Sequence, residues 1–327
     1  MTSQPLSARP LTTDGTVELA ILERSGMIES RHLGAAVVVS ADGTVVRSLG
    51  DPEALVYPRS SLKPLQAVSV LRSGVQLDGE QLVLATASHS GTADHQRVAA
   101  EILDRAGLGE DDLRCPPDWP SDPAAAALAR TSGNPRRLAM NCSGKHAAFL
   151  LSCVHNGWSI DDYLDPLHPL QQLIRATAEE FTGAGIGHLG TDGCGAPLFG
   201  ISLLGLATAI SRVSQGTEDS TARLVTAIRE HPWAIDGRGR ANTIVIEQLG
   251  LIAKLGAEGV NVMAAADGTT VAVKMLDGSG RATTLVALEL LASVGAIDAD
   301  DAKRVAALTT EQVLGAGEPV GEFRTAF

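Results

Sequence analysis

The sequence predicts an α+β fold in which strands from both ends of the chain form one antiparallel sheet beside a helical lobe. Two observations indicate the sheet: β-branched runs flank Asp42-Gly43 near the start of the chain and Asp267-Gly268 near its end, and such dipeptides favour hairpin turns because they accept positive φ. A third is the helical pattern of the segments between residues 59 and 235, many of which close at a glycine. Because strands and helices are segregated along the chain, we expect an antiparallel sheet.

The elements are expected in a definite order. Residues 1–15 are predicted to be a flexible N-terminal tail, and residues 16–327 a single domain that is strand-rich over 16–58 and 236–327 and helical over 59–235. The helical segments are expected at 60–74, 91–107, 123–131, 142–157, 168–183, 196–214 and 220–232. Strands are expected to return at residue 260, and a final helix is expected near 298–315.

Composition limits the class of protein. Hydrophobic residues make up 44% of the 327 residues and aromatics only 3%, which is typical of a globular core built from Ala, Val, Leu and Ile. The net charge of −12 argues against a nucleic-acid surface, because phosphate binding needs clustered Lys and Arg. No apolar run approaches the ~18 residues of a membrane span, and the N-terminus lacks the apolar core of a signal peptide. We therefore expect a cytoplasmic protein.

The stretch "YPRSSLKPLQ" (57–66) places a hydroxyl and an amine at the start of a helix. Ser60 and Lys63 are three residues apart and can share a helix face, whereas Ser61 points elsewhere. A serine becomes a good nucleophile when a neutral lysine accepts its proton, which requires burial or neighbouring cations to lower the lysine pKa. Alone, this spacing is more often a capping serine beside a solvated lysine.

Four other features of the sequence contain residue types that are common in catalytic or ligand-binding sites. "ASHSG" brings Ser88 and Ser90 into a tight turn, "NCSGKH" places Cys142 and Lys145 at a helix start, where thiolates and anions are favoured, and "TDGCGAP" surrounds Asp192 and Cys194 with glycines. Lys274 interrupts an apolar strand. Their structural alternatives are a helix cap, buried cysteines, an ordinary loop and an edge lysine that prevents aggregation.

These motifs, in this order, resemble the asparaginase II family. The similarity runs from "ESRHLGAAVVVSADG" and "VYPRSSLKPLQA" through "ASHSG", "NCSGKHAAFL", "YLDPLHPLQ" and "TDGCGAP" to "IAKLGAEGV" and "GRA", which is nearly the whole chain. The resemblance implies a fold like that of serine β-lactamases and glutaminases. It also implies a homodimer.

The resemblance further implies the roles of particular residues. Two Ser–Lys tandems are expected, Ser60 with Lys63 and a serine of the "SHSG" turn with Lys274; we assign the second serine to Ser88, with Ser90 as a close competitor. A zinc ion is expected on Cys142, Lys145 and Cys194. The substrate-binding residues are expected to be Arg59, Ser90, Asp192, Arg240 and Asn242.

The implied activity is hydrolysis of L-asparagine to L-aspartate and ammonia through a Ser–Lys acyl-enzyme, with no organic cofactor. Two alternatives stay open. One is a glutaminase or another serine hydrolase of the same architecture, which an ammonia-release assay on Asn and Gln would separate. The other is a non-catalytic metal-binding relative, which would bind metal without turnover.

Overall fold

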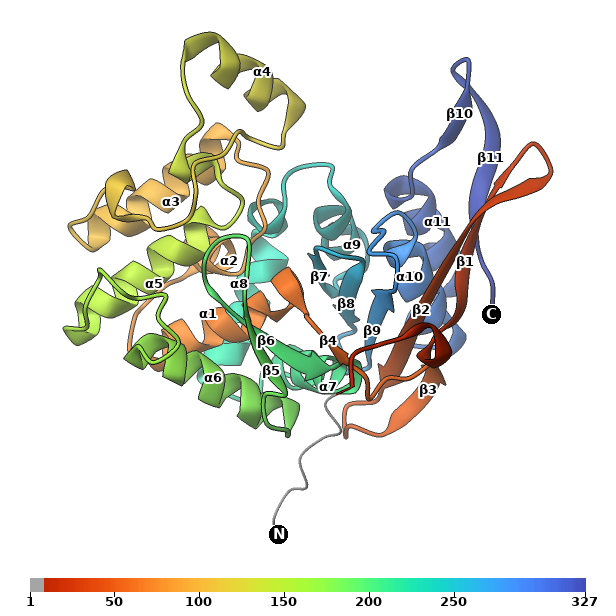
Figure 1. Ribbon diagram of the computed structural model, residues 1–327, viewed down its shortest axis with the longest axis horizontal. Coiled ribbons are helices and arrows are strands. Elements are labelled where there is room, and N and C mark those ends of the chain that lie inside the picture. The colour runs from red at the N-terminus through yellow and green to blue at the C-terminus, as the bar shows by residue number, and fades with distance from the viewer. Residues whose placement is uncertain (1–8) are drawn as a thin grey trace.

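A computed structural model describes residues 9–327 (Figure 1). The predicted flexible tail lies outside the described residues over 1–8. The remainder of that segment, residues 9–15, makes backbone contacts with the rest of the domain. The Leu55 N–H donates to the Arg9 carbonyl at 2.9 Å and the Leu11 N–H donates to the Leu55 carbonyl at 3.2 Å, and Thr13–Gly15 form a 3₁₀ turn. Backbone pairing with residue 55 therefore holds this segment in place.

The main sheet joins strands from the two ends of the chain, as predicted. In the order β10-β11-β1-β2-β9-β8-β7, with β3 also paired to β2, all its pairings are antiparallel. A smaller sheet has the order β4-β6-β5. The strands are β1 (Val17–Arg24), β2 (Met27–Val39), β3 (Val45–Leu49), β4 (Leu55–Val56), β5 (His188–Thr191), β6 (Pro197–Ser202), β7 (Ile252–Gly256), β8 (Val260–Ala264), β9 (Thr270–Met275), β10 (Val313–Gly315) and β11 (Glu318–Thr325).

Both predicted hairpins are present. β2 and β3 pair across the Asp42-Gly43 turn, and β8 and β9 pair across Asp267-Gly268. The sequence reading missed β7, which precedes residue 260, and the β10–β11 hairpin at the C-terminus. β7 is the strand at the end of the sheet path that packs against the serine segment after Tyr57.

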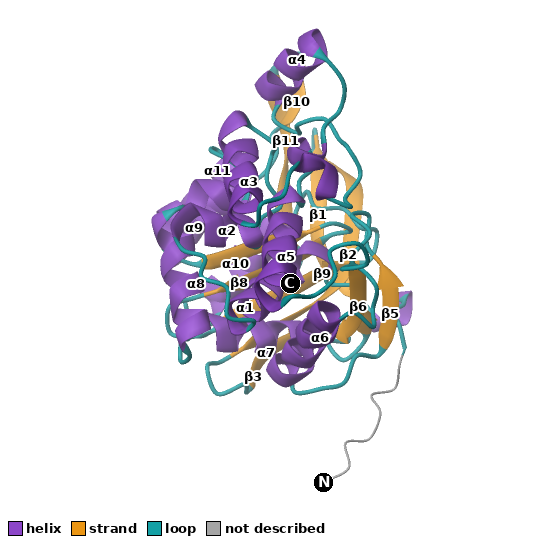
Figure 2. Cartoon of the chain, turned by 90° about the vertical axis from the view of Figure 1, so that its left-hand side faces the viewer, coloured by secondary structure: helices purple, strands orange, loops and turns teal. Residues whose placement is uncertain are grey.

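Most helices form a lobe beside the sheet, whereas the last two pack against each other next to the C-terminal strands (Figures 1 and 2). The helices are α1 (Lys63–Arg72), α2 (Gly79–Ala85), α3 (Ala93–Arg105), α4 (Pro123–Ser132), α5 (Ser143–Asn156), α6 (Pro169–Thr182), α7 (Leu203–Ser214), α8 (Asp219–Glu230), α9 (Ala241–Leu249), α10 (Thr283–Ser293) and α11 (Ala299–Thr309). Helix α1 packs against α2, α5, α6, α7 and α8. Since its residues from Lys63 to Leu71 are all buried, α1 is the centre of the lobe.

The core of the sheet is covered on both faces. Every residue of β2 from Ala35 to Val39 is at most 1% exposed, and neighbouring residues of a strand point to opposite faces. Helix α7 packs on β2, β8 and β9, and α10 packs on β8, β9 and β11. The helical and strand-rich regions overlap more than expected, because β5 and β6 fall within the helical region and α9 to α11 within the C-terminal one.

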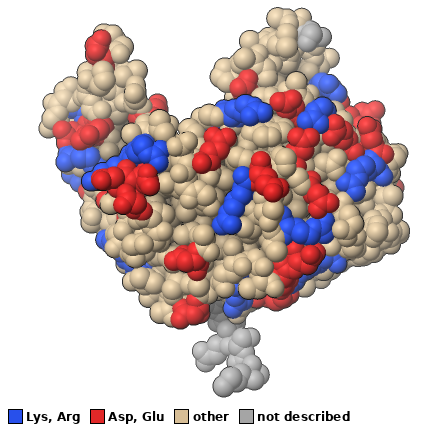
Figure 3. All heavy atoms as spheres, turned by 180° about the vertical axis from the view of Figure 1, so that it is seen from behind, with Lys and Arg blue, Asp and Glu red and all other residues tan. Residues whose placement is uncertain are grey.

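Figure 3 shows that the surface is notched between two projections, which Figure 1 identifies as α4 and the β10–β11 hairpin. On the face shown in Figure 3, acidic and basic side chains are intermixed, without a broad area of one sign. Across residues 9–327, the helices are too short or too polar for any of them to cross a bilayer.

Candidate active site

The Ser60 segment is a short 3₁₀ helix, η2 (Arg59–Leu62), that leads directly into α1. Pro64 lies in the first turn of α1, where its missing N–H is tolerated. The Ser61 hydroxyl is buried and donates to the Pro58 carbonyl at 2.6 Å, so this serine is engaged structurally. Ser60 is partly exposed, and its carbonyl accepts the Lys63 N–H. Of the two serines, Ser60 is the one accessible to a substrate.

Lys63 extends from the start of α1 into the interior and is 1% exposed. Its ammonium group lies 3.0 Å from the Ser88 hydroxyl and 3.0 Å from the Cys142 sulfur, and it also bonds to the Ala87 carbonyl. Ser88, and not Ser90, is therefore the serine of the "SHSG" turn that meets a lysine. The catalytic role of Ser88 stays a prediction.

A second lysine reaches the same hydroxyl, and it is Lys254. Its Nζ lies 2.9 Å from Ser88 Oγ and 2.9 Å from the Leu255 carbonyl, and the residue is completely buried. The Ser88 hydroxyl thus bridges two amines from opposite sides of the site, one on α1 and one on β7. The sequence signal for Lys254 is the motif "IAKLGAEGV", where a lysine interrupts a short apolar run and a glycine follows two residues later.

The pairing of Ser88 with Lys274 is corrected by this arrangement. Lys274 lies on β9, and its amine donates to the backbone carbonyls of Glu258 at 2.7 Å and of Met275. In the sheet, Lys254 pairs with Val262 and Val262 with Ala272, so Lys274 is two strands away and two residues further along. The sequence pointed to Lys274 because this lysine interrupts a clearly apolar strand. Lys254 was overlooked because the short strand β7 was not predicted.

Burial makes the two-lysine arrangement chemically useful. Removal from water, together with the positive charge of Lys63, lowers the pKa of Lys254 to about 7. The site therefore holds a lysine that exchanges its proton near neutral pH. When Lys254 is neutral, it accepts a hydrogen bond from the Ser88 hydroxyl, which at the same time accepts one from Lys63.

Glycine allows β7 to approach the Ser60 segment. A Cβ atom on Gly256 would lie 2.6 Å from the Pro58 carbonyl oxygen and 3.3 Å from the Ser61 nitrogen. Both atoms belong to the backbone, so they cannot move aside as a flexible side chain would. Gly256 therefore lets the strand that carries Lys254 lie directly against the backbone of the Ser60 segment.

The two cysteines predicted to bind metal are brought together. Hydrogen bonding from the Cys142 thiol and the charge of Lys145 hold the pKa of Cys194 well below its usual value, and the same contact and burial raise the pKa of Cys142. The Lys145 amine lies 3.0 Å from the Cys194 sulfur. Burial opposes protonation of Lys145, but the two sulfurs keep its pKa above the ordinary value. The site thus contains an ammonium–thiolate pair.

The predicted zinc ligands are Cys142, Lys145 and Cys194. Within residues 9–327, no group of three His, Cys, Asp or Glu side chains is arranged to hold a metal ion, so Lys145 is essential to the set. Cys142 and Lys145 are one turn apart on α5 and both meet Cys194. Two sulfurs and one amine are nitrogen and sulfur donors of the kind that zinc takes.

Arg59 and Asp192 form an ion pair at the entrance to the site. Arg59 Nε donates to Asp192 Oδ1 at 2.8 Å, and the other carboxylate oxygen lies 3.6 Å from the Cys194 sulfur. Arg59 has a φ of 51°, which is uncommon for a residue with a side chain and occurs often at functional sites. This pair supplies both a cation and an anion next to Ser60.

The remaining predicted substrate-binding residues have structural partners. Arg240 is exposed and donates to Asp236 at 2.8 Å. Asn242 is buried, and its side-chain oxygen accepts the Leu255 N–H at 2.9 Å, which fixes the residue after Lys254. Ser90 is buried, and its N–H donates to the Asp236 carbonyl at 2.8 Å.

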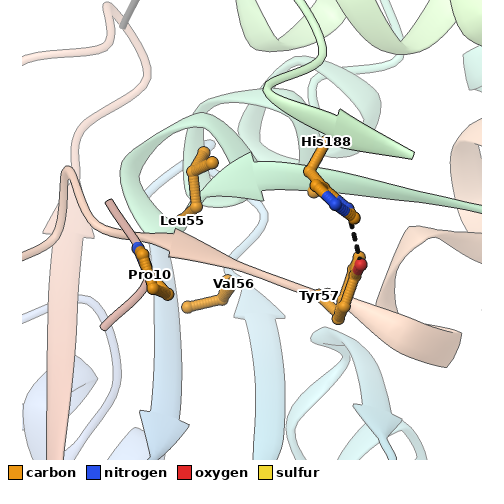
Figure 4. A pocket seen from close by; sticks show the side chains of 6 residues that line it. Pro10, Leu55, Val56, Tyr57 and His188 are labelled. Atoms are coloured by element: carbon orange, nitrogen blue, oxygen red, sulfur yellow. Dashed lines mark hydrogen bonds between the residues drawn. The ribbon is translucent and has the colours of Figure 1, made fainter. Parts of the chain in front are cut away.

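A pocket lies next to β4, the strand that precedes the Ser60 segment (Figure 4). It has a volume of about 290 Å³ and is lined by Pro10, Leu55, Val56, Tyr57, His188 and Gly200. The Tyr57 hydroxyl and His188 Nδ1 are 2.7 Å apart. Because Tyr57 precedes Arg59 and His188 precedes Asp192, this hydrogen bond and the Arg59–Asp192 ion pair join the same two segments.

Fold and site together define a class: an α+β protein in which buried lysine amines hold a serine hydroxyl, the arrangement from which covalent serine catalysis is built. The model of the L-asparaginase II family matches residues 20–325. The chain therefore belongs to the L-asparaginase II family, and this membership implies an L-asparaginase-type amidohydrolase. It confirms the resemblance seen in the sequence motifs.

Comparison with solved structures gave more distant similarities. A putative beta-lactamase from Bacteroides dorei DSM 17855 has 15% sequence identity and a TM-score of 0.41, with 76% of this chain and 86% of that chain covered. The native form of Mglu has 14% identity and a TM-score of 0.35, with 80% of this chain and 63% of that chain covered. No curated protein matches the chain.

Proposed function

We propose that this protein hydrolyses L-asparagine to L-aspartate and ammonia through a serine–lysine acyl-enzyme. The observation that carries this proposal is the Ser88 hydroxyl held between two buried lysines, Lys63 at 3.0 Å and Lys254 at 2.9 Å. Family membership supplies the substrate class, since it implies an L-asparaginase-type amidohydrolase.

The bridge supplies a route for preparing the catalytic base. With Lys254 neutral, the Ser88 hydroxyl proton passes to Lys254 while Ser88 receives a proton from Lys63. The hydroxyl is regenerated, the positive charge has moved to Lys254, and Lys63 is left with a free electron pair. Ser60 lies three residues before Lys63 and is partly exposed, and this spacing allows the two side chains to share a helix face. Lys63 is thereby the base for Ser60.

The chemical steps follow from these positions. Ser60 Oγ attacks the side-chain carbonyl carbon of asparagine as its proton goes to Lys63. The C–N bond then breaks as the leaving nitrogen receives a proton from Lys254 through Ser88, so ammonia departs and an ester to Ser60 remains. Lys63 then passes the proton it took from Ser60 through Ser88 to the neutral Lys254 and is again the free base. Water attacks the ester as its proton goes to Lys63, and Lys63 returns that proton to Ser60 as the C–O bond breaks and aspartate is released.

The two charged groups of the substrate each need a protein group of the opposite charge. An amino acid carries an α-carboxylate and an α-ammonium group, and Arg59 and Asp192 form an ion pair at 2.8 Å beside Ser60. Exchange of that pair for contacts with the substrate would bind both groups without leaving a partly buried charge unpaired.

We also propose that Cys142, Lys145 and Cys194 would hold a zinc ion. When bound, such an ion supplies a Lewis acid and a positive charge near the substrate. Coordination requires Lys145 to give up its proton, so binding should release protons and strengthen with pH. Metal analysis of the purified protein and of a Cys194→Ala variant tests this assignment; equal zinc content in both would contradict it.

A homodimer is the assembly that we propose. Exposed apolar side chains gather on two neighbouring hairpins, where Met27 is 69% and Leu314 45% exposed, and Arg24 bonds to the Leu314 carbonyl. Such a patch is typical of an interaction surface. Sedimentation analysis should give a dimer for the natural chain and a shift toward monomer for Met27→Glu; a monomeric natural chain contradicts the proposal.

The decisive experiment measures ammonia release from Asn and Gln by the natural chain and by Ser60→Ala and Ser88→Ala. Loss of the Ser60 nucleophile should abolish both turnover and the ester adduct detectable by mass spectrometry. Loss of the Ser88 bridge should lower kcat by about 10²- to 10⁴-fold, the range of general acid–base effects. Ser61→Ala is the matched control and should retain most of the activity. Natural-level turnover by Ser60→Ala overturns the nucleophile assignment, and faster turnover of Gln than Asn overturns the substrate.

A further inference from the structure

His89 lies between Ser88 and Ser90 but points away from the site entrance, into the start of α5. It is 1% exposed. Its Nδ1 accepts the Gly91 N–H at 3.2 Å, so Nε2 carries the proton and donates to Ser143 Oγ at 2.9 Å. Ser143 in turn donates to the Leu138 carbonyl at 2.9 Å. Burial holds the pKa of His89 well below its usual value, which agrees with the neutral ring that this chain of hydrogen bonds requires.

The backbone of His89 makes a second contact with the same segment. Its N–H donates to the Asn141 carbonyl at 3.1 Å. His89 therefore holds both neighbours of Cys142, Asn141 through the main chain and Ser143 through the side chain. On the other side of the turn, the Ser88 N–H donates to the Ile235 carbonyl at 2.9 Å.

This double contact has consequences for Lys63. The Lys63 amine lies between Ser88 Oγ on the turn and Cys142 Sγ on the α5 segment, at 3.0 Å from each. His89 joins the two segments, so it sets the position of Ser88 Oγ relative to Cys142 Sγ. A small displacement of the turn would lengthen the Ser88 contact with both lysines, and misplacement by about 1 Å can cost on the order of 10²-fold in rate.

We propose that His89 is a positioning residue that, through its Nε2–H···Ser143 hydrogen bond, fixes the Ser88 hydroxyl between Lys63 and Lys254. The inference rests on the proposed serine–lysine mechanism. His89 is buried and acts through Ser88, so it does not contact the substrate. Its loss should reduce kcat and leave KM nearly unchanged, because Arg59 and Asp192 belong to other segments.

The test compares two variants of α5, each of which replaces one buried serine by alanine. Ser143→Ala removes the acceptor of the His89 proton. Ser152→Ala is the matched control, because Ser152 is also completely buried on α5 but bonds to Ser73 at 2.7 Å. We expect Ser143→Ala to lower kcat by about tenfold with KM within about twofold, and Ser152→Ala to keep both. The melting temperatures of the two variants should be similar.

Two His89 variants sharpen the result. His89→Gln keeps an N–H donor and should retain more kcat than His89→Leu, which has none; if His89→Leu does not fold, the Ser143 and Ser152 pair still decides. The inference is overturned if Ser143→Ala matches Ser152→Ala in kcat while Ser88→Ala is impaired. If Ser88→Ala is itself as active as the natural chain, the serine–lysine mechanism fails instead, so the two failures are distinguishable.

Discussion

Two strands of the same sheet each carry one lysine, and the two lysines have different surroundings. Lys254 on β7 is completely buried and bonds to Ser88, whereas Lys274 on β9 is partly exposed and bonds to the Glu258 and Met275 carbonyls. β7 ends the sheet path and packs against η2, while β9 lies between β2 and β8. The position of a strand in the sheet, and not the apolar sequence around the lysine, decides which amine reaches the serines.

The largest expected difference is between the alanine variants of these two lysines. Lys254→Ala removes the amine that exchanges protons with Ser88 and should lower kcat by about 10²- to 10⁴-fold. Lys274→Ala removes contacts with backbone carbonyls only and should keep kcat within about twofold. Steady-state kinetics on asparagine measures both. An inactive Lys274 variant that is folded by circular dichroism would restore Lys274 to the site and reverse the comparison.

The pH dependence should report the same difference. Because burial and Lys63 lower the pKa of Lys254 to about 7, the neutral form predominates only above that pH. kcat/KM should therefore fall about tenfold per pH unit below pH 7 and level off above it. Lys254→Arg should lose the active plateau at every pH, since a guanidinium stays protonated. A Lys274→Ala profile that differs from the natural one would contradict this assignment.

A smaller effect is expected where β7 approaches the Ser60 segment. Gly256→Ala places a Cβ atom 2.6 Å from the Pro58 carbonyl, so the backbone must shift, and we expect a several-fold lower kcat together with a lower melting temperature. Gly280, which follows β9, has open space around its Cα, and Gly280→Ala should be neutral. Equal kinetics for the two variants would show that the close approach of β7 is not required.

Local sequence signals predicted a large part of the fold. Asp42-Gly43 and Asp267-Gly268 specify hairpins because their preferred backbone conformations fit the turn, and this information is contained in a few adjacent residues. The same holds for the helix after Ser60, where the first-turn proline fixes the start. β7 was missed because five residues that follow a helix closely and include a lysine give a weak periodic signal.

The site was predicted less completely than the fold. Ser88, Cys142, Lys145, Cys194 and Asp192 are near one another as the motifs indicated, but Lys254 was not chosen and Asn242 has a supporting role. Arg240, exposed and paired with Asp236, also has a partner of its own. A motif names residue types at a given spacing, whereas contacts between residues far apart in the chain depend on strand order and register.

By itself, the sequence determined that this chain has an α+β fold with a sheet made from both ends, and that it carries the motifs of the asparaginase II family. Those properties follow from local backbone preferences and from hydrophobic patterning. Only the tertiary structure decided that Lys254 faces Ser88, because strand order at the sheet edge brings the side chains of Lys63, Ser88 and Lys254 together. Burial there lowers the pKa of Lys254, and burial is a property of the whole fold.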